Sequence, residues 1–175
     1  DAAGLFFAVT NTVTYGDLTA VSSVAYDSQG RVVSRTGALG NTVETAYDSL
    51  GQTLSLSGAT YPVTYGYDTA GRMTALSTTR DGETWDTTLW LYENATGLLT
   101  NKVYADGSRV SYAYTLGGKL ATRVWARGLA TAYSYDALGQ LVNIGYHGTW
   151  YDVYYAYDVF GYAAASSNSF ARYEY

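Results

Sequence analysis

Tyr26-Asp27-Ser28-Gln29-Gly30-Arg31 is the first intact copy of a motif that returns roughly every 20 to 26 residues along this chain. Each intact copy is a tyrosine, an aspartate, two variable residues and a glycine, followed by Arg or Gln. A fixed period of this size is typical of repeat proteins, in which each unit buries its apolar residues only against its neighbours. The intact copies contain Tyr26, Asp27, Gly30 and Arg31; Tyr47, Asp48 and Gly51; Tyr67, Asp68, Gly71 and Arg72; and Tyr135, Asp136 and Gly139.

Four further copies are degraded by an insertion or by the loss of a tyrosine, an acid or a basic residue. They are Tyr92 to Gly97, which has one extra residue; Tyr114 to Gly118, which has no acid; Tyr157, Asp158 and Gly161, which have no basic residue after them; and Asp1 and Gly4, which have no tyrosine before them. We therefore expect a single array of about seven to eight repeats over residues 1–175, with no second domain.

The motif has the composition of a tight turn between two antiparallel strands. In a type I turn, Asp is favoured at the first position because its carboxylate accepts hydrogen bonds from backbone N–H groups two residues on, and Gly is favoured at the fourth because it adopts positive φ without strain. Asp-x-x-Gly therefore predicts a hairpin connection with a glycine bulge, and the tyrosine before it ends a strand. The flanking residues alternate at a period of two, as in Val63-Thr64-Tyr65-Gly66-Tyr67, which is typical of strands with tyrosines on one face.

A second set of turn signals lies between successive motifs: Thr36 to Asn41, Ser57 to Ala59, Asp81-Gly82, Asp106-Gly107, Arg127-Gly128 and His147-Gly148. Each repeat is therefore expected to be two short antiparallel strands with a turn at either end. The predicted fold class is all-β: a repetitive antiparallel β-hairpin strip of about 14 strands, each about 5 to 7 residues long. Open sheets of this length usually twist and curl, so we expect a spiral, shell or tube.

These motifs resemble the RHS or YD-repeat family, found in bacterial toxin shells, in large toxin-complex proteins and in the extracellular part of animal teneurins. The resemblance covers nearly the whole chain and implies a continuous β-strip that spirals into a hollow shell, often around a C-terminal toxin. The family's shell-closing segment has an Asp- and Pro-rich self-cleavage signature, which has no counterpart here because the only proline is Pro62. The resemblance therefore implies no cleavage activity for this chain.

The two ends of the chain carry complementary parts of the motif. The chain opens on Asp1-Ala2-Ala3-Gly4 and closes on Tyr173-Glu174-Tyr175, so joining Tyr175 to another Asp1 would restore a complete motif. Two explanations fit: a slice cut in repeat phase from a longer polypeptide, or a unit that meets a copy of itself end to end. We favour a segment of something longer, and the expected partners are neighbouring repeats or further copies of the chain.

Composition and charge argue against two classes of partner. The formal net charge is −5, the pI is about 4.6, and the ten basic residues are dispersed, so there is no basic patch for nucleic acid. No apolar run approaches the 18 or more residues of a spanning helix, and we expect no membrane insertion.

Cysteine is absent, as in many long-lived extracellular bacterial proteins. We expect a secreted or cell-surface protein of bacterial origin.

Catalytic and metal-binding arrangements are not predicted. His147 is the only histidine and lies beside Gly148 at an expected hairpin tip, so a turn residue is favoured over a general base. Each repeated aspartate comes with its own turn glycine and lies one repeat from the next, which turn formation explains without a calcium site. Arg31, Arg72 and Lys119 are interpreted as solvated turn-flanking residues or as partners of neighbouring carboxylates. We expect no enzymatic activity, metal or cofactor.

The expected function is structural: the wall of an extracellular assembly, either an open tube or filament, or part of a hollow RHS-type shell around a toxin cargo. A chain of 175 residues is too short to enclose a cargo domain, so the open form accounts better for the complementary ends. The alternative is an adhesion module that binds surface glycans through exposed tyrosine and tryptophan rows. The stretch from Trp150 to Tyr155 could stack on sugars, although two faces of one strand explain it more simply.

Overall fold

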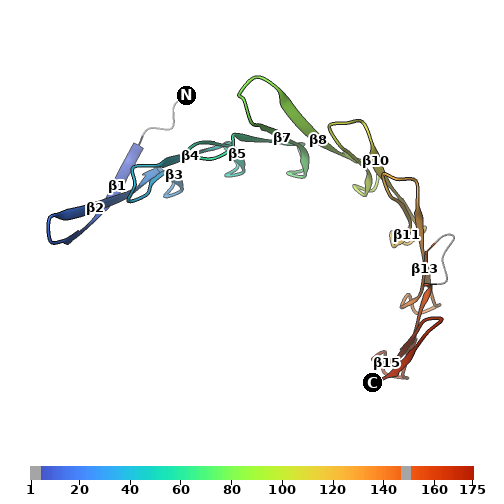
Figure 1. Cartoon of the computed structure of the whole chain (residues 1–175). Helices are drawn as coiled ribbons and strands as arrows, with labels where there is room; N and C mark the ends of the chain where they lie inside the picture. The colour runs from blue at the N-terminus through green and yellow to red at the C-terminus, as the bar shows by residue number, and fades with distance from the viewer. Residues whose placement is uncertain (1–4, 147–150) are drawn as a thin grey trace. The chain divides into compact units, whose positions relative to one another are not determined.

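The strands that the structure describes are all antiparallel to their neighbours (Figure 1). The computed structural model describes residues 5–146 and 151–175, and these contain 16 strands and no helix. The strands are β1 (Leu5–Tyr15), β2 (Leu18–Asp27), β3 (Val32–Thr36), β4 (Thr42–Tyr47), β5 (Thr53–Gly58), β6 (Val63–Tyr67), β7 (Met73–Thr79), β8 (Trp85–Tyr92), β9 (Leu99–Val103), β10 (Arg109–Tyr114), β11 (Leu120–Val124), β12 (Ala130–Tyr135), β13 (Leu141–Tyr146), β14 (Val153–Tyr157), β15 (Ala163–Ser167) and β16 (Arg172–Glu174).

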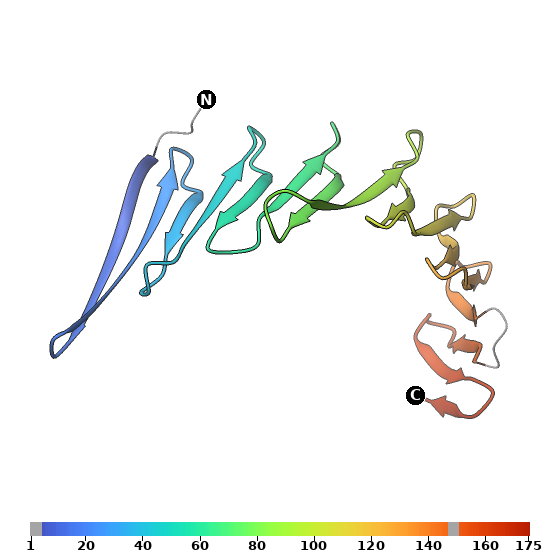
Figure 2. The same cartoon turned by 45° about the horizontal axis from the view of Figure 1, so that its top comes forward.

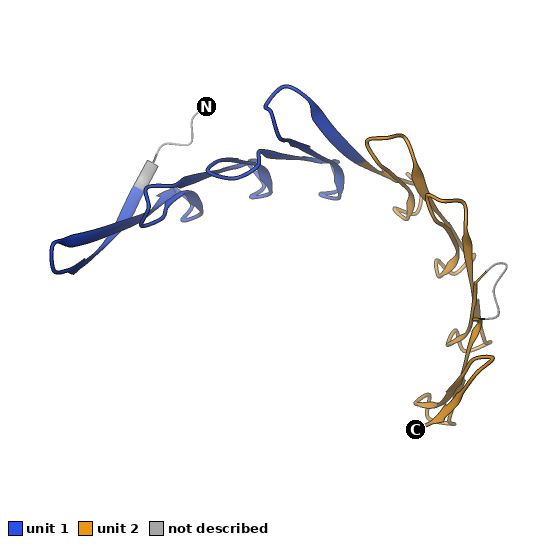
Figure 3. Ribbon diagram, viewed as in Figure 1, with its two compact units in different colours: residues 1–88 blue, residues 89–175 orange. Residues whose placement is uncertain are grey.

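Each strand neighbours the strands that come before and after it in the sequence, and no crossover occurs among the described strands. The chain divides into two compact units, residues 1–88 and residues 89–175 (Figure 3). Within each unit the hairpins follow one another as a single layer of sheet (Figure 2). The predicted all-β hairpin strip is therefore confirmed, whereas its curling into a spiral, shell or tube remains a prediction.

The tyrosine of each motif marks the point where the strand pairing shifts by one residue. In β4, for example, Ala46 pairs with Ser55 whereas Tyr47 pairs with Thr53, so one residue of the partner strand is left over as a bulge. The same shift occurs at the tyrosines that end β6, β8, β10, β12 and β14. The residue left over in β5 is Leu54, so this bulge is distinct from the predicted glycine bulge. The glycine bulge lies in the turn itself, where the amide of Asp48 donates to the carbonyl of Gln52 and Gly51 has φ at 87°.

The first unit has two chemically different faces. Residues directly opposite one another in paired strands share a face, so rows across the sheet follow from the register. One row consists of Ala46, Ser55, Thr64 and Ser77, and we name the face that carries it the small-residue face. The opposite face carries Val43, Leu56, Val63, Tyr65 and Leu76, and we name it the tyrosine face.

The second unit repeats this division. Its small-residue face carries the row Ala113, Thr122, Ala132 and Gly145. Its tyrosine face carries Tyr112, Arg123, Thr131, Tyr133 and Ile144. Among the residues that the structure describes, Val110 and Ala165 are the only buried hydrophobic side chains. Most of the remaining apolar side chains in the strands are half-buried. In a single layer, each side chain is covered by its neighbours in the same sheet, but no second layer packs over the face from which it projects.

Two expectations about the strands need correction. The strand lengths are not all within 5 to 7 residues, since β1 has 11, β2 has 10 and β8 has 8. The first two strands are long because a tight turn at Gly16, with φ at 60°, allows the alternating stretches on either side to pair without interruption. The stretch from Trp150 to Tyr155 is not one strand, because β14 begins at Val153 and Trp150 lies outside the described residues.

Candidate functional site

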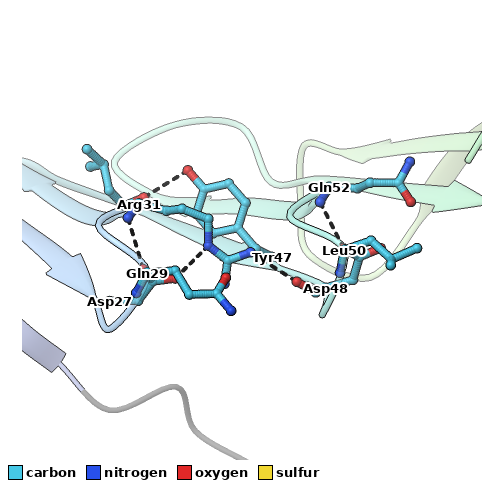
Figure 4. A network of polar contacts seen from close by, with 8 residues as sticks. Asp27, Gln29, Arg31, Tyr47, Asp48, Leu50 and Gln52 are labelled. Carbon is cyan, nitrogen blue, oxygen red and sulfur yellow. Dashed lines mark hydrogen bonds and ion pairs between the residues drawn. The ribbon is translucent and has the colours of Figure 1, made fainter.

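The aspartate of each intact motif ties its own turn together. The Oδ1 atom of Asp27 accepts hydrogen bonds from the backbone amides of Gln29 and Arg31, both at 2.9 Å (Figure 4). The amide of Gly30 donates to the carbonyl of Asp27, and Gly30 has φ at 77°, the left-handed conformation that favours glycine. Asp48, Asp68 and Asp158 make the same two side-chain bonds, and Asp136 makes the bond to the residue after its glycine.

Arg31 closes the turn of its own repeat and also reaches the next one. Its Nε donates to Oδ2 of Asp27 at 2.7 Å, and Asp27 is only 1% exposed. Its Nη1 donates to the carbonyl of Asp48 at 3.0 Å, and its guanidinium lies 4.6 Å from the ring centre of Tyr47 (Figure 4). One side chain thus joins two turns that are 21 positions apart in the sequence by ionic, hydrogen-bonding and cation–π contacts.

Other repeats use the same position after the glycine to bridge to the next turn. Gln52 donates from Nε2 to the carbonyl of Gly71 at 2.9 Å, and Gln140 donates to the carbonyl of Gly161 at 3.3 Å. Lys119 donates to the carbonyl of Gly139, and its ammonium lies 5.2 Å from the ring centre of Tyr135. The interpretation of Arg31 and Arg72 as carboxylate partners is confirmed by their ion pairs, whereas Lys119 contacts a carbonyl and a ring instead.

The tyrosine of the motif makes a second contact between repeats. Its hydroxyl donates to a backbone carbonyl in the preceding repeat, namely that of the first residue of the strand that follows the preceding motif turn. The pairs are Tyr47 to Val32 at 3.0 Å, Tyr67 to Thr53 at 2.9 Å, Tyr114 to Leu99 at 2.8 Å, Tyr135 to Leu120 at 2.9 Å and Tyr157 to Leu141 at 2.8 Å. A phenylalanine could fill the same space but could not make this bond.

The degraded copies keep the turn but change how it is held. In the turn at Thr115 the threonine hydroxyl accepts the amide of Lys119 at 3.1 Å, which replaces one bond of the missing carboxylate. The copy at Glu93 has one extra residue: the amide of Gly97 bonds to the carbonyl of Glu93, and the Glu93 side chain accepts the hydroxyl of Thr96. The predicted insertion in this copy is therefore accommodated inside the turn.

Hydrogen bonds from turn amides lower the pKa of several aspartates. Burial raises the pKa of Asp27, but bonds from the amide and guanidinium of Arg31 outweigh it and leave this pKa below its usual range. The amide of Arg72 is the main reason why the pKa of Asp68 is lowered. The amides of Thr84 and Glu83 lower the pKa of Asp81 to about 2. Bonds from Ser108 lower the pKa of Asp106. All four groups are therefore held as carboxylate anions by turn geometry.

In these turns the carboxylates already accept hydrogen bonds from backbone amides. In residues 5–146 and 151–175, no group of three or more acidic or histidine side chains is arranged to hold a metal ion. His147 and the motif residues Asp1 and Gly4 lie outside the described residues. None of the described residues belongs to a helix that could cross a membrane. What the described turns do is join repeat to repeat.

The described part of the aromatic stretch near the C-terminus contains two exposed tyrosines, Tyr151 and Tyr154. Tyr151 is 60% exposed and its ring centre lies 5.7 Å from that of Phe170. Tyr154 is 52% exposed on β14, and Asp152 accepts the amide of Tyr146 at 2.9 Å, which anchors the connection before β14. These rings are accessible, and they are the part of the described surface that the adhesion hypothesis would use.

The family comparison matches the part of the chain where these contacts are most complete. The RHS Repeat family model matches residues 26–62, a stretch that contains the turns at Asp27 and Asp48, the Arg31 bridge and the Tyr47 hydroxyl bond. Residues 26–62 are therefore similar to an RHS repeat. Outside residues 26–62, the motif turns at Asp68, Thr115, Asp136 and Asp158 make the same pair of backbone hydrogen bonds. A comparison with curated protein sequences gave no match.

One solved structure supports the fold of the chain. In the crystal structure of TcdB2-TccC3-Cdc42, one chain matches with a TM-score of 0.68 at 16% identity, over 85% of this chain and 9% of that one. The TcdB2-TccC3-TEV structure and the Photorhabdus luminescens Tc holotoxin pore match with TM-scores of 0.35 and 0.34, at 18% and 13% identity. They cover 90% and 91% of this chain, and 12% and 14% of those chains. The chain therefore shares the fold of a small part of a much longer protein.

Proposed function

We propose that this RHS-repeat strip forms part of the wall of an extracellular assembly. The observation that carries the proposal is the set of contacts that recurs within each unit, in which tyrosine hydroxyls and, at several turns, Arg, Gln or Lys side chains join one repeat to the next. These contacts hold a thin layer together edge to edge without a core beneath it. A wall one layer thick requires such lateral contacts, because neighbouring repeats must stay joined while both faces of the sheet remain free to contact other molecules.

The two faces of the strip support a wall that separates two environments. The small-residue face offers mainly Ser, Thr and Ala, whereas the tyrosine face offers large rings and aliphatic side chains. With only two buried hydrophobic side chains among the described residues, the tyrosine face retains apolar area that further protein would cover. In a hollow shell a toxin cargo would supply that cover, and in an open tube or filament further copies of the strip would supply it.

We extend the proposal to the absence of enzymatic activity in this stretch. Its carboxylates are engaged by backbone amides, as at Asp27 and Asp81, and this explains their abundance without a catalytic role. A secreted or surface location accords with the family resemblance. A second candidate function is an adhesion module, which the exposed rings of Tyr151, Tyr154 and Phe170 favour.

Imaging of the native material that carries this sequence tests the proposal. Negative-stain electron microscopy of the unfractionated material should show hollow particles of uniform size, or long uniform tubes or filaments. Compact particles without a cavity, together with saturable binding on a glycan array, would instead favour the adhesion module. Enzymatic turnover assigned to residues of this strip would contradict its purely structural role.

A further inference from the structure

One position in the second unit lacks the bridge between turns. Leu98 occupies the place after the turn glycine that Arg31 occupies in the first unit. The equivalence is structural: the amide of Glu93 donates to the carbonyl of Leu98 at 2.9 Å, as the amide of Asp27 does to the carbonyl of Arg31. A leucine side chain cannot donate a hydrogen bond, so this turn is not bridged to the next by its own side chain.

The three groups that Arg31 contacts nevertheless have counterparts beside Leu98. Glu93 supplies a carboxylate at the place of Asp27, and the ring of Tyr114 stands at the place of Tyr47. The backbone register is the same, because the hydroxyl of Tyr114 bonds to Leu99 as that of Tyr47 bonds to Val32. The carbonyl of Thr115, the first residue of the next turn, stands at the place of the Asp48 carbonyl. A carboxylate, an aromatic ring and a carbonyl thus surround the position that the guanidinium group of Arg31 occupies in the first unit, and here no basic side chain follows the turn glycine.

A groove lies at this position within the second unit. It has a volume of about 360 Å³ and is lined by Glu93, Leu98, Thr100, Tyr112, Tyr114 and Thr115. Glu93 is exposed and its carboxylate accepts the hydroxyl of Thr96, but no basic side chain among the described residues pairs with it. The groove therefore combines a negative charge, a half-buried tyrosine ring and open space.

We propose that this groove receives an arginine or lysine side chain of a partner polypeptide. Within this chain a cation at the equivalent position binds a carboxylate at 2.7 Å, a carbonyl at 3.0 Å and a ring centre at 4.6 Å. The groove offers all three kinds of group to a side chain of the same chemistry. The partner's basic residue would complete the row of bridges that Leu98 interrupts. The inference does not depend on the kind of assembly that the strip forms.

A peptide titration of the whole chain tests the site. The probe is an arginine tripeptide, N-acetyl-Ala-Arg-Ala-amide, and the control probe replaces arginine with norleucine. Backbone amide shifts of Gly97 and Gly118, followed by NMR, report on the turns beside the groove. We expect saturable shifts with the arginine peptide, on the order of millimolar affinity, and at least about tenfold weaker binding of the norleucine peptide.

Variants separate the groove from binding elsewhere on the chain. Leu98→Arg should abolish the shifts because it fills the groove from within, and Glu93→Gln should weaken binding several-fold because it removes the charge. Lys119→Leu provides the matched control: it should open a groove at the next turn that offers a ring and a carbonyl but no carboxylate, because that turn begins with Thr115, so any shift at Gly139 should be several-fold weaker than the shift at Gly97. Equal binding of the norleucine peptide, no shift in the natural chain, or undiminished binding to both Leu98→Arg and Glu93→Gln would overturn the proposal.

Discussion

The hydroxyl of Tyr135 lies 2.9 Å from the carbonyl oxygen of Leu120, which belongs to the preceding repeat. Tyr135 is the last residue of β12, and its hydroxyl donates a hydrogen bond to Leu120, the first residue of β11. Four other motif tyrosines make the equivalent bond. This bond gives a reason for tyrosine instead of phenylalanine at these five positions, because the repeat needs both a ring and a hydrogen-bond donor there.

Replacement of Tyr135 by phenylalanine should destabilise the second unit. The ring and its packing are kept, but the carbonyl of Leu120 loses its partner, so we expect a loss of about 0.5–1.5 kcal/mol in the free energy of unfolding. Urea denaturation followed by circular dichroism measures it. The matched control is Tyr133→Phe, two residues earlier in β12, where no hydroxyl hydrogen bond is made among the described residues. Equal losses in the two variants would argue against the hydroxyl bond as the reason for tyrosine.

The turns and strands were predictable from sequence because their causes are local. Asp27 and Gly30 lie three residues apart and specify the turn by themselves, through the amide bonds to Oδ1 and the positive φ of glycine. Thr115 shows the same locality, since its hydroxyl replaces a missing carboxylate within one turn. The sequence pattern therefore predicted the fold class and the repeat boundaries.

The contacts between repeats were not predictable in the same way. The bond from Gln52 to Gly71 depends on how two neighbouring turns stand side by side, which the sequence alone does not specify. The role of Gln52 and Gln140 was therefore missed, and Lys119 was assigned to solvent or to a carboxylate although it contacts Gly139. A signal was present: Arg, Gln or Lys recurs after the turn glycine, and each can donate a hydrogen bond over a long reach.

A pair of adjacent glycines tests the conformational reason for the motif. Gly118 has φ at 76° and an added Cβ would meet no atom within 4 Å, so any cost of Gly118→Ala comes from the backbone. We expect a loss of about 1–2 kcal/mol in the free energy of unfolding. Gly117 does not have positive φ, and Gly117→Ala should be neutral or stabilise by about 0.4–1 kcal/mol. Thermal denaturation of both variants gives the comparison, and a neutral Gly118→Ala would contradict the assigned turn.

The bridging role of Arg31 predicts that lysine cannot replace it. Two different nitrogens of Arg31 donate hydrogen bonds, one to the carboxylate of Asp27 and one to the carbonyl of Asp48. Lysine has a single nitrogen, so it cannot make both bonds in the same geometry. Arg31→Lys should therefore lower the melting temperature although charge is conserved. Arg35→Lys is the control, because Arg35 is exposed and makes no polar contact among the described residues. If both variants melt at the same temperature, the two-turn contact does not contribute to stability.

Acidification should weaken the turns. The pKa of Asp81 is about 2, below its ordinary value of 3.8, and the pKa values of Asp27, Asp68 and Asp106 are lowered as well. A carboxyl group with a lowered pKa in the folded state contributes stability that is complete above the unfolded value and is lost as the pH falls through the folded value. We therefore expect the melting temperature to be constant down to about pH 4 and to fall between about pH 4 and pH 2.

The connection between β7 and β8 should account for a measurable part of this dependence. Asp81 accepts the amides of Glu83 and Thr84 at 2.9 and 2.8 Å, and it accepts the hydroxyl of Thr79 at 3.0 Å. Asp81→Asn keeps an acceptor oxygen but cannot titrate, so its melting temperature should be lower at pH 6 and fall less steeply toward pH 2. Asp17→Asn, at an exposed turn, should leave the slope unchanged. A slope unaltered by Asp81→Asn would show that protonation of this carboxylate does not limit stability in acid.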